Sequence, residues 1–180
     1  MSKTNQYHLV LLTKNYGESF FHLIENNKSR LEDFFAGTVS KTSTLNDTLT
    51  YCQEIEEKIK AKSYFPYLIL EKTTNNLVGF IDVKNIDWNI PKAELGAFID
   101  TDYEGKGIIT VLGNELISSI VVEHQFKKLY CRVAPRNTRS IQLVNRIGFQ
   151  LEGTILRDYR TTKGELVDMN YYGKLFDVGD

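Results

Sequence analysis

Residues 94–110 read ELGAFIDTDYEGKGIIT, and this stretch decides the fold of the chain. An apolar run ends in a turn that carries Gly105 and Gly107, and an apolar helical pattern begins directly after the turn. Glycine lets the backbone approach a ligand closely, and the first amides of a helix have no partner inside that helix. The stretch therefore predicts a strand, a turn and a helix start that together bind a phosphate group.

Helices and strands alternate irregularly around this turn. After it, Ile108, Leu112, Leu116 and Ile120 recur every four residues and predict a long amphipathic helix. Residues 37–47 are rich in Ser and Thr and are predicted to form a surface loop. The other patterns predict helices over 19–26, 47–62 and 135–147 and strands over 8–12, 64–71, 77–83, 93–99, 128–133, 151–156 and 166–172. This order predicts an α/β (α+β) fold with a mixed sheet.

Bulk composition limits the functions that the chain can serve. Its 180 residues fit a single domain, 1–180, and a formal net charge of -1 gives no general attraction to nucleic acid or to an anionic membrane. Cys52 and Cys131 are too few for a disulfide scaffold or a zinc cluster and are expected to be buried thiols. Neither a signal peptide nor a membrane span is apparent, so we expect a cytoplasmic protein with no metal site.

Three common nucleotide-binding patterns can be tested against the turn. The dinucleotide pattern G-x-G-x-x-G fails because Thr110 stands where the third glycine belongs. The P-loop pattern and the glycine-rich loop of kinases do not occur. What remains is a phosphate-binding turn that requires no metal.

Four segments in order carry a family resemblance: 93–96 (AELG), 103–108 (YEGKGI), 137–141 (NTRSI) and 147–153 (IGFQLEG). Together they resemble the GNAT acetyltransferases, and among these the RimL/RimJ type, which acetylates ribosomal-protein N-termini. The resemblance implies a GNAT fold, a mixed, mostly antiparallel seven-stranded sheet flanked by helices. It also implies that the strand over 93–99 splays away from the strand over 128–133.

Acetyl-CoA is the donor that this resemblance implies. The family's binding mode assigns its pyrophosphate to backbone amides of the turn and its pantetheine arm to the edge of the preceding strand. One departure concerns Glu104, since the family usually has Gln or Arg there; Lys106 is expected to offset its charge. The implied cofactor-binding residues are Phe98, Ile99, Glu104, Gly105, Lys106, Gly107, Ile108, Ile109, Thr110, Asn137 and Ser140.

Acetyl transfer to an amine needs an uncharged amine, a stabilised oxyanion and a proton for the departing thiolate. The amide of Phe98 or Ile99 is a candidate for the oxyanion, and the family's motif makes Ser140 the candidate acid. Glu94 is a candidate base, and Tyr159 stands where RimL-like enzymes carry an acidic residue. The alternatives are ordinary structural roles, a capping serine and a salt-bridged carboxylate.

The acceptor is predicted from the energy needed to deprotonate it. At pH 7 this costs about 1–1.4 kcal/mol for a protein α-amine and about 4.6 kcal/mol for a lysine, so an α-amine tolerates a poor base. We therefore expect a ribosomal-protein-like N-terminus as acceptor, with a polyamine, an aminoglycoside or a non-catalytic acyl-CoA-binding role as alternatives. The resemblance also implies a homodimer.

The residues expected to recognise the acceptor are Arg30, Phe34, Phe35, Asp87 and Trp88, whereas His124 is expected at the surface.

Overall fold

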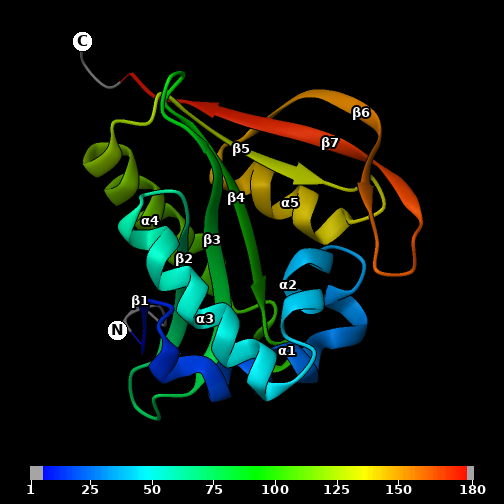
Figure 1. The fold of residues 1–180 in the computed structure, drawn as a ribbon. Helices are drawn as coiled ribbons and strands as arrows, with labels where there is room; N and C mark the ends of the chain where they lie inside the picture. The colour runs from blue at the N-terminus through cyan, green and yellow to red at the C-terminus, as the bar shows by residue number, and fades with distance from the viewer. Residues whose placement is uncertain (1–5, 178–180) are drawn as a thin grey trace.

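A seven-stranded sheet runs through residues 6–177, the part of the chain that the computed structural model describes (Figure 1). The strand order is β1-β2-β3-β4-β5-β7-β6, and only the β4–β5 pair is parallel. This confirms the mixed, mostly antiparallel sheet. The ends of the predicted domain, 1–5 and 178–180, lie outside the described residues. The strands are β1 (Tyr7–Leu11), β2 (Phe65–Glu71), β3 (Leu77–Asp87), β4 (Lys92–Ile99), β5 (Lys128–Val133), β6 (Gln150–Arg160) and β7 (Leu166–Leu175).

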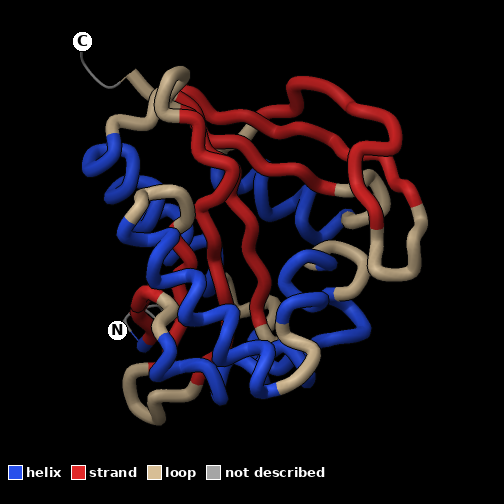
Figure 2. The backbone as a smooth tube through the Cα atoms, in the orientation of Figure 1, coloured by secondary structure: helices blue, strands red, loops and turns tan. Residues whose placement is uncertain are grey.

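Helices cover both faces of the sheet (Figure 2). The N-terminal helices pack on one face and α4 with α5 on the other, because each helix buries one apolar side. The predicted face Ile108, Leu112, Leu116 and Ile120 is buried against the sheet. The helices are α1 (Gly17–Leu31), α2 (Ala36–Lys41), α3 (Leu45–Lys60), α4 (Ile108–His124) and α5 (Thr138–Ile147), with short 3-10 turns η2 (Lys14–Tyr16) and η3 (Thr101–Tyr103).

The N-terminal helical region differs from its prediction. Residues 37–47 are not a loop, because α2 occupies the first half of the segment and α3 begins within it, at Leu45. Thr38 and Val39 are buried, and the Thr42 hydroxyl donates to the Thr38 carbonyl at 2.9 Å. Burial and local hydrogen bonds thus outweigh the weak helix preference of Ser and Thr. The predicted helix over 19–26 is likewise longer, since α1 spans Gly17–Leu31.

β4 and β5 are joined at one end only. Residues 92–94 of β4 pair with 128–130 of β5, and no pairing continues beyond them, whereas β4 stays paired with β3 as far as Ile99 (Figure 1). This confirms the predicted splay. The Asp100 amide donates to Val78 of β3, and strand amides alternate in direction. The amide of Phe98 therefore also points to β3, whereas those of Ala97 and Ile99 point into the gap.

Candidate active site

The turn after η3 presents a row of free backbone amides. Gly105 and Gly107 have φ of +72° and +75°, a left-handed conformation that glycine adopts without strain. Within residues 6–177, none of the amides of residues 105–110 has a hydrogen-bond acceptor. The family resemblance also implied a free amide at Glu104, but this amide donates to the Thr101 carbonyl at 3.3 Å. Successive free amides in such a turn, at the N-terminus of α4, form a concave site for an anion.

The carboxylate of Glu104 does not face the turn alone. One of its oxygens pairs with Arg30 of α1 and the other with Arg139 of α5. The expectation that Lys106 offsets this charge is wrong, because its ammonium donates to the Asp102 carbonyl at 2.8 Å and lies over the Tyr103 ring. Two arginines from distant segments therefore balance the carboxylate.

An outer cavity of about 690 Å³ opens over this turn. The two arginines stand in its wall, so it combines positive charge with free amides. Phe98 and Ile99 of β4 line it as well. The predicted cofactor residues in its lining are Phe98, Ile99, Glu104, Gly105, Gly107, Ile108, Ile109, Thr110 and Asn137, whereas Lys106 and Ser140 are not part of it.

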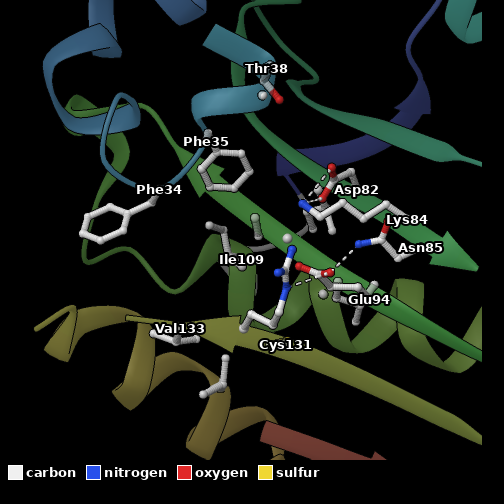
Figure 3. Close-up of a pocket in the computed structure, with 18 of the residues that line it drawn as sticks. Phe34, Phe35, Thr38, Asp82, Lys84, Asn85, Glu94, Ile109, Cys131 and Val133 are labelled. Carbon is white, nitrogen blue, oxygen red and sulfur yellow. Dashed lines mark hydrogen bonds and ion pairs between the residues drawn. The ribbon is translucent and has the colours of Figure 1, made fainter. Parts of the chain in front are cut away.

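An inner cavity of about 550 Å³ continues from the outer one through the gap between β4 and β5. Its walls include apolar side chains of α4 and α5 on one face of the sheet and polar side chains of β3, β4 and β5 on the other. Figure 3 shows Phe34 and Phe35 on one side of it and Cys131 and Val133 of β5 on another. The residues that line both cavities are Phe34, Phe35, Ala97, Ile109, Asn137 and Leu143.

Charged side chains of alternating sign cross the floor of the inner cavity. Lys84 contacts both oxygens of Asp82 at 3.2 Å, and Arg132 pairs with Glu94 at 3.1 Å and with Asp158 at 3.2 Å. Burial raises the pKa of Asp82, although the Lys84 ammonium opposes this rise. Burial alone would lower the pKa of Arg132, but the Glu94 carboxylate raises it overall. The carboxylates of this row are thus paired with cations.

Glu94 is buried, with 4% of the residue exposed, and is held from one side only. The Asn85 amide donates to its Oε2 at 2.7 Å (Figure 3). Arg132 Nε lies 3.1 Å from the same oxygen. Within the described residues, Oε1 accepts no hydrogen bond. A carboxylate whose second oxygen is free at the wall of a cavity has the geometry of a general base.

Gly96 makes room for this charged row. An added Cβ at this position would lie 2.5 Å from Asp82 Oδ1, 2.8 Å from Lys84 Nζ and 3.5 Å from the Phe35 ring. Any larger residue would therefore displace the Asp82–Lys84 pair or the aromatic wall.

The first turn of α5 carries Asn137 and Ser140. The side-chain oxygen of Asn137 accepts a hydrogen bond from the Ser140 amide at 3.1 Å, so Asn137 caps the helix. The Ser140 hydroxyl makes no hydrogen bond within the described residues and is not committed to capping. Ser140 lines neither cavity, yet it lies on the same helix face as Asn137, Leu143 and Val144, which line the inner cavity.

Tyr159 of β6 lies in the wall of the inner cavity. Its hydroxyl oxygen accepts a hydrogen bond from the Ala36 amide at 2.7 Å, at the start of α2. Burial raises the pKa of Tyr159, although this hydrogen bond opposes the rise. The phenol is therefore protonated at neutral pH and able to donate a proton.

Cys131 lines the inner cavity from β5 and is buried, as is Cys52. Burial raises the pKa of Cys131 to about 12, and nearby Glu94 adds to the rise. The thiol thus stays protonated at neutral pH and is a poor nucleophile.

Three residues singled out from the sequence lie away from both cavities. The Trp88 indole stacks on Phe126, with the ring centroids 5.4 Å apart, and it meets the His124 ring edge to face. His124 is therefore packed among aromatic rings, whereas the sequence had placed it at the surface. Asp87 accepts hydrogen bonds from the turn amides of Asn89 and Ile90. Arg30 belongs to the outer cavity, so among the residues expected at the acceptor only Phe34 and Phe35 line the inner cavity.

Several site residues had not been singled out from the sequence: Asp82, Lys84, Asn85, Arg132 and Arg139. The alternation of Asp82 and Lys84 along an otherwise apolar strand is a usable signal, since a charge in such a strand must face a partner or a cavity. No such local signal marks Arg139, which lies on an exposed part of α5.

A splayed parallel strand pair, a turn of free amides and two adjoining cavities are combined here with a match to a known family. The family described as an acetyltransferase (GNAT) domain matches residues 10–150. The chain belongs to the GNAT acetyltransferases. This GNAT chain is thus an N-acetyltransferase, and the predicted resemblance is confirmed.

Curated relatives agree with this membership, and a solved structure agrees with the fold. The uncharacterized N-acetyltransferase p20 of Bacillus licheniformis is 32% identical over 61% of either chain, so this chain spans about three fifths of that relative. YdaF of Bacillus subtilis (strain 168), provisionally named a ribosomal N-acetyltransferase, is 30% identical over 96% of this chain and 93% of its own. Spermidine N(1)-acetyltransferase of Vibrio cholerae is 22% identical over 78% of this chain and 77% of its own. RimL, solved in complex with coenzyme A, superposes with a TM-score of 0.86 at 19% identity, covering 96% of this chain and 95% of its own.

Two features are absent from the part of the chain that the structure describes. Residues 6–177 contain no group of three or more His, Cys, Asp or Glu side chains arranged to hold a metal ion. They also contain no helix with the length and apolar character needed to cross a bilayer.

Proposed function

We propose that this GNAT enzyme transfers an acetyl group directly from acetyl-CoA to a protein N-terminal α-amine. The observation that carries the proposal is the continuity of the two cavities through the β4–β5 gap, with free amides at one end and Glu94 at the other. This arrangement supports a ternary complex, in which donor and acceptor meet without a covalent enzyme intermediate. The protonated Cys131 thiol is in line with this.

The residues present fit acetyl-CoA. The free amides of residues 105–110 and the two arginines suit a pyrophosphate, and the amides of Ala97 and Ile99 point into the gap, where an amide-bearing pantetheine arm finds partners. Acetyl-CoA supplies an acetyl group activated as a thioester. RimL, which has the same fold and was solved in complex with coenzyme A, supports this assignment.

Glu94 is proposed to accept the amine proton through Oε1, directly or through water. The buried ion pair with Arg132 keeps its side chain in place, and the amides that point into the gap are the candidate donors to the oxyanion. In this scheme the Ile99 amide takes the role for which Phe98 was the other candidate, because the Phe98 amide is turned to β3.

Ser140 is proposed to protonate the departing thiolate. We expect Ser140→Ala to lower kcat about tenfold to a hundredfold, because the proton is then drawn from bulk water, with the Kd for acetyl-CoA unchanged. Stopped-flow kinetics and calorimetry measure the two quantities. If Ser140→Ala keeps full kcat and Tyr159→Phe loses it instead, the acid is Tyr159.

The charges of the inner cavity favour a neutral or acidic acceptor over a polyamine. Asp82 and Glu94 are each paired with a cation, Lys84 and Arg132, so the lining carries no excess of negative charge that would attract a polycation. Lys41 and Lys58 also line the cavity and have no carboxylate partner in the described part of the chain, although Lys41 lies over the Tyr51 ring. A polycation would meet net repulsion there. Two such surface charges amount to about a tenfold preference.

An acceptor panel tests the function. Free thiol release from acetyl-CoA is measured with N-terminal peptides, spermidine and an aminoglycoside as acceptors. We expect kcat/KM for a neutral or acidic N-terminal peptide to exceed that for spermidine at least about tenfold. Preferred turnover of spermidine or the aminoglycoside would establish the small-amine alternative. One reported relative, a spermidine N(1)-acetyltransferase, is the reason for testing this alternative. Thermal stabilisation by acetyl-CoA without turnover would establish a binding module.

The resemblance extends the proposal to a homodimer. β6 is one of the two edge strands of the sheet, and it exposes Leu151, Ile155 and Leu156. An exposed apolar edge of this kind is a surface on which a second copy can pair.

A further inference from the structure

The outer cavity, which is the candidate site for phosphate, contains a carboxylate of the chain itself. The Glu104 carboxylate lines the outer cavity, and its side chain retains 23% exposure. The free amides begin at the next residue, Gly105, and Arg30 and Arg139 converge on the carboxylate from two helices. The carboxylate therefore holds the two cations that a phosphate in this cavity would attract.

The two arginines are held to different degrees. Arg30 also donates to the Ile99 carbonyl at 2.5 Å and to Asn27 Oδ1 at 2.8 Å, so α1 and β4 fix its position. The Arg139 side chain is 80% exposed, and Glu104 is its only partner among residues 6–177. Arg139 is thus free to exchange partners, whereas Arg30 stays with Glu104.

We propose that Glu104 is an internal competitor for the phosphates of coenzyme A: it holds Arg139 until a phosphate takes the guanidinium over. The proposal rests on the proposed function, since it assumes that the outer cavity takes the cofactor. A guanidinium forms the same charge-assisted hydrogen bonds with a phosphate as with a carboxylate, and a phosphate can carry more charge. After the exchange, Arg30 still neutralises Glu104, so no carboxylate is left unpaired.

This exchange predicts the sign of two substitutions. Glu104→Gln releases Arg139 beforehand and should tighten coenzyme A binding about threefold to tenfold. Arg139→Gln removes the group that is exchanged and should weaken binding. Simple repulsion between Glu104 and the phosphates would give the same gain with or without Arg139, whereas the exchange predicts that the gain falls by at least about half in Arg139→Gln.

The experiment is a double-mutant cycle read by titration calorimetry with coenzyme A at low ionic strength. It uses the full chain, Glu104→Gln, Arg139→Gln and the double variant, with melting temperatures to confirm folding. Glu115→Gln is the matched control, since it removes the same charge from an exposed position on α4 away from the turn. A parallel titration with dephospho-coenzyme A, which lacks the 3′-phosphate, identifies the phosphate. A gain that vanishes with this ligand assigns the 3′-phosphate, and a gain that persists assigns the pyrophosphate.

Three results would overturn the proposal: unchanged or weaker binding in Glu104→Gln, an equal gain in both backgrounds, or full affinity in Arg139→Gln. The last variant changes a highly exposed side chain, so it remains informative if Glu104→Gln folds poorly. If coenzyme A binds to neither the unmodified chain nor any variant, the proposed function fails. If all of these proteins bind coenzyme A equally well, only the exchange is contradicted and the proposed function is not.

Discussion

Glu94→Gln is expected to lower kcat by about 10²–10⁴-fold and to leave the Kd for acetyl-CoA unchanged. The amide oxygen of glutamine can accept from Asn85 and remain beside Arg132 as Oε2 does, so the fold has little reason to change. The amide nitrogen takes the place of Oε1 and cannot accept a proton. Single-turnover rates with an N-terminal peptide, together with calorimetry for acetyl-CoA, separate the loss of chemistry from a loss of binding.

Asp158→Asn is the matched control for this prediction. Asp158 is the other carboxylate on Arg132, at 3.2 Å, but it does not line the inner cavity. The control therefore removes the same charge from the same arginine without touching the candidate base. A kcat that changes less than about threefold in Glu94→Gln, or equal losses in both variants, would exclude Glu94 as the base.

Phe80→Ala is expected to lower the free energy of unfolding by about 3–5 kcal/mol. Phe80 is fully buried on β3. Its ring centroid lies 5.2 Å from that of Phe20 of α1 and 5.5 Å from that of Phe98 of β4. Removing the ring leaves a cavity between helix and sheet that the packed neighbours can fill only in part. Denaturant unfolding measures the loss, and the melting temperature should fall by on the order of 10 °C.

Phe21→Ala is the control for this second prediction. It makes the same substitution one residue after Phe20 on α1, at a half-buried position. Its cost should be below that of Phe80→Ala, because part of the ring already faces water and its removal leaves no enclosed cavity. Similar costs for the two variants would show that the helix, and not the core between α1 and the sheet, limits stability.

The turn and the helix after it were predictable because their signals are local. Gly105 and Gly107 mark the turn, and the four-residue repeat from Ile108 marks the buried face of α4. The β4–β5 gap came from family resemblance alone, since no pattern in either strand tells where the pairing stops. The helical state of α2 was missed because it depends on the burial of Thr38 and Val39 against other elements.

The charged parts of the site depend on register and on contacts between distant segments. Lys84 faces Glu94, and Glu94 faces Tyr130 next to Arg132, only because three strands meet in one register. Arg30 and Arg139 reach Glu104 across 74 and 35 residues of sequence. The sequence marked Glu104 as an unexpected carboxylate, yet nothing near it pointed to the arginines that balance it.

The incomplete β4–β5 ladder makes the sheet weakest at its functional centre. The amides of Ala97 and Ile99 have no strand partner on that side, so they should exchange with solvent deuterium without any unfolding, while Leu68 and Phe80 in the neighbouring strands stay protected. A ligand that lies along the gap supplies the missing edge. Binding would then complete the hydrogen bonding of β4 on its open side. The amides of Ala97 and Ile99 would change from fast exchange in the free enzyme to slow exchange in the complex.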